Sequence, residues 1–455
     1  MGRILTWTSI FYYKRTNDHL TQKLTITHMK TIKNYLVLAL CLTGLTGFAQ
    51  INLQPEIQNF REPGYEGLNV FETPKDDTTA YEGLKVRVGG DFAMQFQGLS
   101  HSNSNANDTL ITLGNNFNLP TANLNLDVQM HRGLRLHLRT YLSSRHHPEA
   151  WVKGGHLQID RLDFVKDGFL DGVMDLVTIR VGLDEINYGD AHFRRSDNAT
   201  AVYNPFVGNY IIDGFTTEAF GEIYVRKNGF LGMVAVSNGK LNQSVTKANE
   251  DQDASPSFYG KVGYDKQINE KLRFRLTASG YTNSSDLANF LYNGDRASSR
   301  YYNVMDVLDD NMNSDWSGRL TFTIPQVTSF MINPFVKYEG FEFFGLFEII
   351  DGVGFGPPNA NNDIGYTQIG AEALYRFGGN DQLYVGGRYN TVTGEDRADG
   401  QDINRLNVGG GWFMTDNILA KIEYMNQQYE GDGWDGTKFE GGEFNGVVVE
   451  AVISF

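Results

Sequence analysis

Apolar and polar residues alternate along much of this chain with a period of two. Over 84–97 one parity is apolar and the other is polar or charged, and the same pattern recurs over 122–131, 134–142, 272–279 and 405–414. Segments of about ten residues are long enough for a tilted β-strand to cross the hydrocarbon core of a membrane. The pattern therefore predicts strands that face lipid on one side and water on the other.

Short and long links alternate between the predicted strands. We expect short turns at 131–133, 227–229, 266–271, 325–329, 378–382 and 415–417, and long polar links at 100–116, 143–154, 189–215, 239–256, 282–314, 350–363, 391–402 and 430–443. A further link, 166–175, is of medium length and contains a candidate short helix over 169–174. This alternation is typical of membrane barrels, in which short turns lie on the periplasmic side and long loops lie outside.

The number of strands depends on residues 330–349. A hairpin around Gly340 gives seventeen strands, which would place the two ends of the chain on opposite sides of a membrane. One long strand with a bulge near Gly340 gives sixteen and restores the alternation of links. We therefore predict an all-β fold, a transmembrane antiparallel β-barrel of sixteen strands over 84–455. A soluble β-sandwich or β-solenoid is the alternative, but a sandwich does not sustain this alternation of links, and no repeat of 20–50 residues is visible.

The chain ends in a strand that is apolar at every second position back from Phe455. An open apolar edge invites aggregation in water, whereas closure against the first strand of a barrel removes the edge. A last strand that ends in phenylalanine also resembles the assembly signal of Gram-negative outer-membrane barrels. This resemblance implies location in the outer membrane, contact with its lipid, and recognition of Phe455 by the barrel assembly machinery.

The residues that precede the barrel divide into three predicted segments. Residues 29–49 have a basic start, an apolar centre and small residues at a cleavage site, so we expect a signal peptide. Residues 1–28 are then an upstream extension, the result of an incorrectly assigned start. Residues 50–83 are predicted to be an irregular periplasmic N-terminal segment, or a small plug. The single cysteine, Cys41, leaves with the signal peptide, so disulfide and thiolate chemistry are excluded from the remaining chain.

Charge is distributed unevenly between the segments and between the two faces of the strands. The whole chain carries −15 and residues 1–49 carry +5, so the remainder carries −20, which argues against a nucleic-acid partner. The predicted water-facing parity is nevertheless basic, and its predicted pore-lining residues are Lys85, Arg87, Arg135, His137, Arg139, Arg180, Arg273, Arg275, Lys337, Arg388, Arg405 and Lys421. A wall of one sign concentrates ions of the opposite sign, which favours anions. The alternative is that these cations pair with wall acids and only solvate the lumen.

The link 189–215 is long and mixes cations with aromatic residues. We predict that it folds inward as a constriction loop, with the candidate residues Asp190, His192, Arg194, Arg195, Tyr203, Asn204 and Phe206. A solvated loop that caps the barrel from outside is the alternative.

The segment 179–189, with the sequence IRVGLDEINYG, resembles the strand-to-loop stretch of the phosphate-selective porin family and its relatives in Bacteroidota. The residues after the glycine, 183–185, depart from the family pattern because they remove a lysine and add two acids. The resemblance implies a porin-like barrel in the outer membrane of a Gram-negative bacterium. It also implies passage of small hydrophilic or anionic solutes and assembly as a homotrimer.

Catalytic and metal-binding patterns are weak. The adjacent pair His146 and His147 lies in a loop without ligand spacing, and His137 lies between two arginines with no carboxylate in sequence to orient it. We therefore predict no catalytic residues, no metal site and no cofactor. The expected function is an outer-membrane porin, a water-filled diffusion channel with a preference for anions. The alternatives are a plugged, structural or secretion-associated barrel, and an outer-membrane barrel enzyme.

Overall fold

Side-chain exposure along the strands is the reverse of that in a soluble protein. In β1 (Lys85–Ser102), Phe92, Met94 and Phe96 are about 40% exposed, whereas the intervening Gln95 is fully buried and Asp91 is nearly so. Exposed apolar residues continue around the other strands, including Val234, Val262 and Ile422. An apolar exterior around a polar interior is stable only when the surrounding solvent is lipid.

The computed structural model describes residues 54–455, apart from 74, 76–77, 119, 144–149, 246–254, 295–300, 309–315 and 357–360. The predicted extension 1–28, the predicted signal peptide 29–49 and the pair His146 and His147 lie outside the described residues. No helix in the described part of the chain has both the length and the apolar character needed to cross a membrane.

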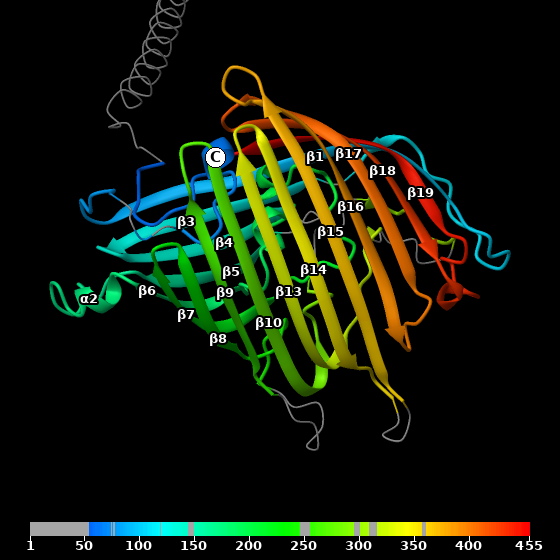
Figure 1. Cartoon of the computed structure of the whole chain (residues 1–455), viewed down its shortest axis with the longest axis horizontal. Helices are drawn as coiled ribbons and strands as arrows, with labels where there is room; N and C mark the ends of the chain where they lie inside the picture. Colours follow the sequence, from blue (N-terminus) through cyan, green and yellow to red (C-terminus); the bar gives the residue numbers. More distant parts are fainter. Residues whose placement is uncertain are drawn as a thin grey trace, which may run out of the picture. The chain divides into compact units, whose positions relative to one another are not determined.

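Sixteen strands form one closed antiparallel sheet, in which each strand pairs with the next and β1 pairs with β19. The strands after β1 are β3 (Thr121–His131), β4 (Leu134–Ser143), β5 (Trp151–Ile159), β6 (Val177–Glu185), β7 (Thr217–Lys227), β8 (Phe230–Ser237), β9 (Ser257–Gln267), β10 (Leu272–Asn289), β13 (Ile324–Tyr338), β14 (Phe341–Val353), β15 (Asp363–Phe377), β16 (Leu383–Asp396), β17 (Asp402–Thr415), β18 (Ile418–Glu430) and β19 (Glu443–Ser454). Neighbouring strands follow one another in chain order around the barrel (Figure 1). The predicted sixteen-stranded barrel is confirmed.

The prediction of one long strand over 330–349 is wrong. Residues 339–340 form a turn between β13 and β14, and Glu339 has the positive φ of 50° that such a turn requires. The pairing of β13 with β14 keeps one register throughout, from Ile332 with Phe347 to Phe335 with Phe344, and is interrupted only beside Pro334, which has no N–H to donate. The count stays at sixteen because the expected turn at 325–329 is part of β13.

The remaining elements lie in the links. They are η1 (Gly64–Gly67), β2 (Asn116–Phe117), α2 (Asp171–Met174), η2 (Ala191–Arg194), η3 (Ala201–Tyr203), the pair β11 (Tyr301–Tyr302) and β12 (Trp316–Ser317), and η4 (Asp432–Trp434). The helix α2 lies where the sequence predicts a short helix. Short links recur at one end of the barrel, apart from the longer link 160–176, so the turns 132–133, 228–229, 339–340 and 416–417 share the end that we assign to the periplasm.

Candidate functional site

The link between β6 and β7, residues 186–216, folds into the barrel; we call it the lumen loop. Its backbone N–H groups donate to side chains on three separate strands of the inner wall. The N–H of Val207 donates to Glu423 at 2.7 Å, and that of Ile211 donates to Asn390 at 2.7 Å. Wall side chains therefore satisfy backbone groups that a loop buried in this way would otherwise leave unpaired.

All seven candidate constriction residues are buried, with exposed fractions of 7% or less. They do not form one cluster, because they contact different parts of the wall. The carboxylate of Asp190 lies 2.8 Å from Arg275, Arg194 pairs with Glu372 at 2.5 Å, and the amide oxygen of Asn204 accepts from Arg388 at 3.0 Å. The loop therefore folds inward, as predicted, and does not cap the barrel from outside.

Residues 54–84, which we call the N-terminal arm, pack against both the wall and the lumen loop. The Phe71 ring lies between Phe193 of the loop and Phe335 of β13, with ring centres 5.7 and 5.5 Å away. The adjacent Glu72 carboxylate lies 2.8 Å from Arg275 of β10. Sequence analysis left this segment either as an irregular lead-in or as a plug, and here its central residues are buried inside the barrel.

The wall cations chosen from parity lie on the inner face of the strands. Arg87, Arg135, His137, Arg139, Arg275, Arg388, Arg405 and Lys421 are buried, whereas Lys85, Arg180, Arg273 and Lys337 are half-buried. Most of them pair with acids, for example Arg135 with Asp127 at 2.7 Å and Arg388 with Glu372 at 2.7 Å. Arg405 instead donates to Gln427 and to a backbone carbonyl. Pairing across the inner face, the alternative left open by the sequence, therefore neutralises much of this basic wall.

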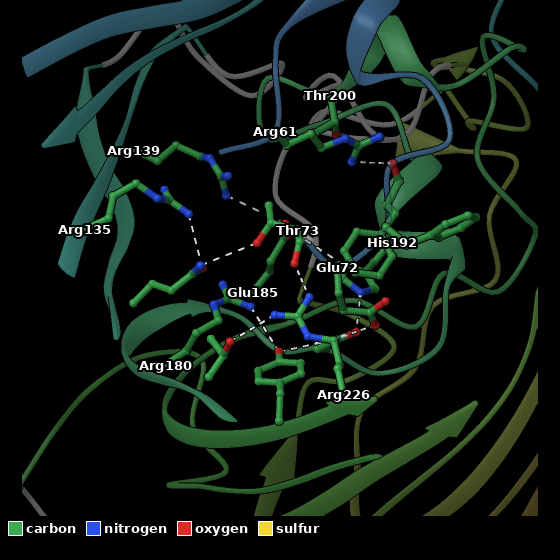
Figure 2. Close-up of a pocket in the computed structure, with 16 residues that line it drawn as sticks. Arg61, Glu72, Thr73, Arg135, Arg139, Arg180, Glu185, His192, Thr200 and Arg226 are labelled. Atoms are coloured by element: carbon green, nitrogen blue, oxygen red, sulfur yellow. Dashed lines mark hydrogen bonds and ion pairs between the residues drawn. The ribbon is translucent and has the colours of Figure 1, made fainter. Parts of the chain in front are cut away.

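Arginines outnumber acids in the lining of one cavity of about 160 Å³, which we call the chamber. Strands β4, β6 and β7, the N-terminal arm and the lumen loop all line it. Its charged lining residues are Arg61, Arg135, Arg139, Arg180, Arg226, Glu72 and Glu185, that is, five guanidinium groups against two carboxylates. Figure 2 shows these arginines entering the chamber from several sides.

Two further cavities adjoin the chamber through shared lining residues. One, of about 140 Å³, shares Arg61, Arg135 and Arg139 with it. The other, of about 650 Å³, shares Phe71 and Arg226 and reaches the turn 228–229 at the periplasmic end. The chamber thus lies next to a wider vestibule at the periplasmic end of the barrel.

Arg61 differs from the wall arginines because it makes no ion pair with any residue that the structure describes. Its guanidinium donates to the carbonyl of Gly67 at 3.0 Å and to that of Phe193 at 3.1 Å, and it lies 3.6 Å from the centre of the Tyr203 ring. Its Nη2 has no hydrogen-bond partner. Burial lowers the pKa of Arg61 to about 10, so the group remains charged at neutral pH.

Two other groups outside the strands affect the charge of the chamber. Burial lowers the pKa of His192, although Glu185 opposes the shift, so at neutral pH the imidazole adds no positive charge. Burial alone would raise the pKa of Glu72, but Arg275 and Lys261 outweigh it and bring the pKa to about 2. Glu72 is therefore ionised and already paired with wall cations.

Sequence reasoning identified Arg135, Arg139, Arg180 and His192 among the residues around the chamber but missed Arg61 and Arg226. Arg226 continues the inward parity of Glu222 and Tyr224 on β7, so extending the alternation to the end of that strand would have found it. Arg61 lies in an irregular segment, where no periodicity indicates which way a side chain points.

No protein-family model matches the chain, and no curated protein matches its sequence. Among solved structures, the anion-selective porin from Comamonas acidovorans covers 82% of this chain with all of its own length, at a TM-score of 0.50 and 11% identity. This protein has the fold of an outer-membrane porin. The outer-membrane channel DcaP of Acinetobacter baumannii, at 10% identity and a TM-score of 0.49, covers 83% of this chain with 99% of its own. The porin-like barrel and its apolar exterior place the protein in the outer membrane.

Proposed function

We propose that this protein is an outer-membrane channel through which small hydrophilic solutes diffuse, with a preference for anions. The observation that carries the proposal is the chamber, where five arginines face two glutamates inside a porin-like barrel. Fixed charge of one sign in a narrow aqueous path raises the local concentration of the opposite ion. Passage is passive in this proposal, and no catalytic step is assigned to the barrel.

The preference depends on cations that have no acid partner rather than on all twelve wall cations. An arginine 2.7 Å from an aspartate presents a dipole to a passing ion, and its field falls off faster than that of a net charge. Arg61, which has no such partner, contributes a full charge at the wall shared by the two smaller cavities. Arg61 should therefore affect selectivity more than the ion-paired arginines of the wall.

A second candidate function is a plugged barrel with a structural or secretion-associated role. The burial of the N-terminal arm beneath the lumen loop favours it, because both occupy space that an open pore would leave to water. In either case we propose that the barrel contacts outer-membrane lipid, is inserted by the barrel assembly machinery through Phe455, and assembles as a homotrimer.

Ion current across planar bilayers tests the proposal. In a potassium chloride gradient, we expect the reversal potential of the purified protein to shift toward the chloride potential. The variant Arg61→Gln should bring the permeability ratio of chloride to potassium closer to unity. Arg132→Gln is the matched control, because that side chain is 54% exposed on a periplasmic turn.

Three results would each count against one part of the proposal. Absence of current both from the whole mature protein and from protein lacking residues 50–83 would favour the plugged or structural barrel. A cation-directed reversal potential would remove the anion preference but keep the channel. Equal effects of the chamber and control variants would show that the chamber does not set selectivity.

A further inference from the structure

The lining of the chamber combines two kinds of group. Guanidinium groups come from the wall and the arm, and the rings of Phe71, Phe193 and Tyr224 line the same space. A purely inorganic anion would use only the guanidinium groups, and a neutral apolar molecule only the rings. Building on the proposed channel function, we propose that the chamber is a binding site for a small organic carboxylate with an apolar body.

The size of the chamber matches such a ligand. Its volume is about 160 Å³. An engineered protein cavity of roughly 150 Å³ lined by apolar residues binds benzene, so one ring or a short branched chain fits in this space. The adjoining cavity of about 140 Å³ shares Arg61, Arg135 and Arg139, which leaves room for the carboxylate beside these three arginines.

Arg61 supplies the reason for the charge on the ligand. Withdrawal of a cation from water without a counter-ion is costly, and the half-buried Arg61 makes no ion pair within the described part of the chain. Two carboxylate oxygens match the fork of a guanidinium group, and such charge-assisted pairs are among the strongest hydrogen bonds in proteins. The wall contributes Arg135 and Arg139 to the same space, and the Nε of each lacks a hydrogen-bond partner.

The site is incomplete without the N-terminal arm. Both Arg61, for the charge, and Phe71, for the apolar side, come from residues 54–84 and not from the barrel wall. The vestibule of about 650 Å³ shares Phe71 and Arg226 with the chamber, so a solute at the periplasmic end lies next to the site. The arm therefore does more than narrow the lumen, because it contributes residues that recognise the ligand.

Isothermal titration calorimetry on the folded, detergent-purified mature protein tests the site. We use benzoate as the probe, benzyl alcohol as its uncharged analogue, and acetate and inorganic phosphate as anions without an apolar body. We expect saturable binding of benzoate and much weaker binding of the other three. Arg61→Gln should weaken benzoate binding roughly tenfold to a hundredfold, the size of a lost hydrogen bond to a charged group. Arg132→Gln should leave it unchanged.

A second variant separates a folding defect from loss of the site. Phe193→Leu should weaken benzoate binding while leaving the weak acetate signal as it is, and both variants should keep the heat-dependent gel migration of a folded barrel. Phosphate binding as tight as benzoate binding would overturn the proposal in favour of an inorganic oxyanion site, and absence of benzoate binding would overturn it outright. Reversal potentials from the same preparations decide separately about the channel: anion preference without benzoate binding removes the site alone.

Discussion

Glu72 is the residue that joins the N-terminal arm to the barrel wall. Its carboxylate lies 2.8 Å from Arg275 and 3.3 Å from Lys261, and both of these cations also contact Asp190 of the lumen loop. One cluster of charges thus connects the wall, the loop and the arm. Because every member is buried, removal of one partner leaves the others poorly compensated.

We expect Glu72→Gln to loosen the arm without unfolding the barrel. Loss of the charge-assisted contacts should reduce the free energy that holds the arm against the wall by roughly 2 kcal/mol. The population of molecules with a detached arm should then rise about thirtyfold. Cleavage within 54–84 by an added protease at neutral pH measures this population. Glu82→Gln is the control on the same segment, because the Glu82 side chain is 71% exposed and its pair with Lys85 should contribute little. Equal cleavage of both variants would contradict the assigned role of Glu72.

The same carboxylate predicts how the arm responds to acid. The pKa of Glu72 is about 2 when the arm is seated, against a usual value of 4.5. Its stabilisation is therefore complete above pH 4.5 and is lost as the pH falls from there toward about 2. Channel conductance should rise over this interval in the wild type but not in Glu72→Gln, where the contact is already absent. Parallel rises in both proteins would assign the effect to other groups.

At the scale of elements, the strands could be predicted, but the packing of the N-terminal arm inside the barrel could not. Alternation at positions such as Phe92 and Gln95 follows from a wall with lipid on one side and water on the other, which is a local property of each strand. The inward fold of the lumen loop was predicted from its length and composition. The packing position of Phe71 was not predicted, because it depends on contacts with Phe193 and Phe335, which are distant in sequence.

The hairpin at Gly340 was missed because the required number of strands was allowed to outweigh the local sequence. The sequence suggested a turn at 325–329. With that turn, both chain ends could lie on the same side of the membrane only if Gly340 was part of a strand. Pro325 is instead the second residue of β13, and a proline near the start of a strand costs little. Gly340 lies in the turn between β13 and β14, where an added Cβ would come 2.2 Å from the carbonyl oxygen of Arg376.

Deletion of the N-terminal arm is the test at the element scale. Protein lacking residues 50–83 keeps all sixteen strands, so we expect a folded barrel with a several-fold larger single-channel conductance and, because Arg61 is gone, a weaker anion preference. Planar-bilayer recordings measure both changes in one experiment. An unchanged conductance would show that the arm does not limit the ion path, even though it packs against the lumen loop.

At the scale of the whole molecule, closure of the barrel determines whether any of these sites exists. The last strand, β19, pairs with β1 along its full length, from Asp91 with Ser454 to Ser102 with Glu443, and also pairs with β18. The backbone of Phe455 exchanges two hydrogen bonds with Gly90, at 2.8 and 3.0 Å. These contacts explain why the apolar strand at the end of the sequence needs no partner beyond the chain itself.

Removal of residues 443–455 should therefore abolish the folded barrel rather than only weaken it. It leaves β1 and β18 with unpaired backbone N–H and C=O groups facing lipid, each of which costs several kcal/mol. We expect this variant to lose both heat-dependent gel migration and protease resistance after refolding into detergent, whereas the longer deletion of residues 50–83 should keep both. A folded, protease-resistant barrel without β19 would mean that β18 pairs with β1 directly, and that fifteen strands are enough to close the sheet.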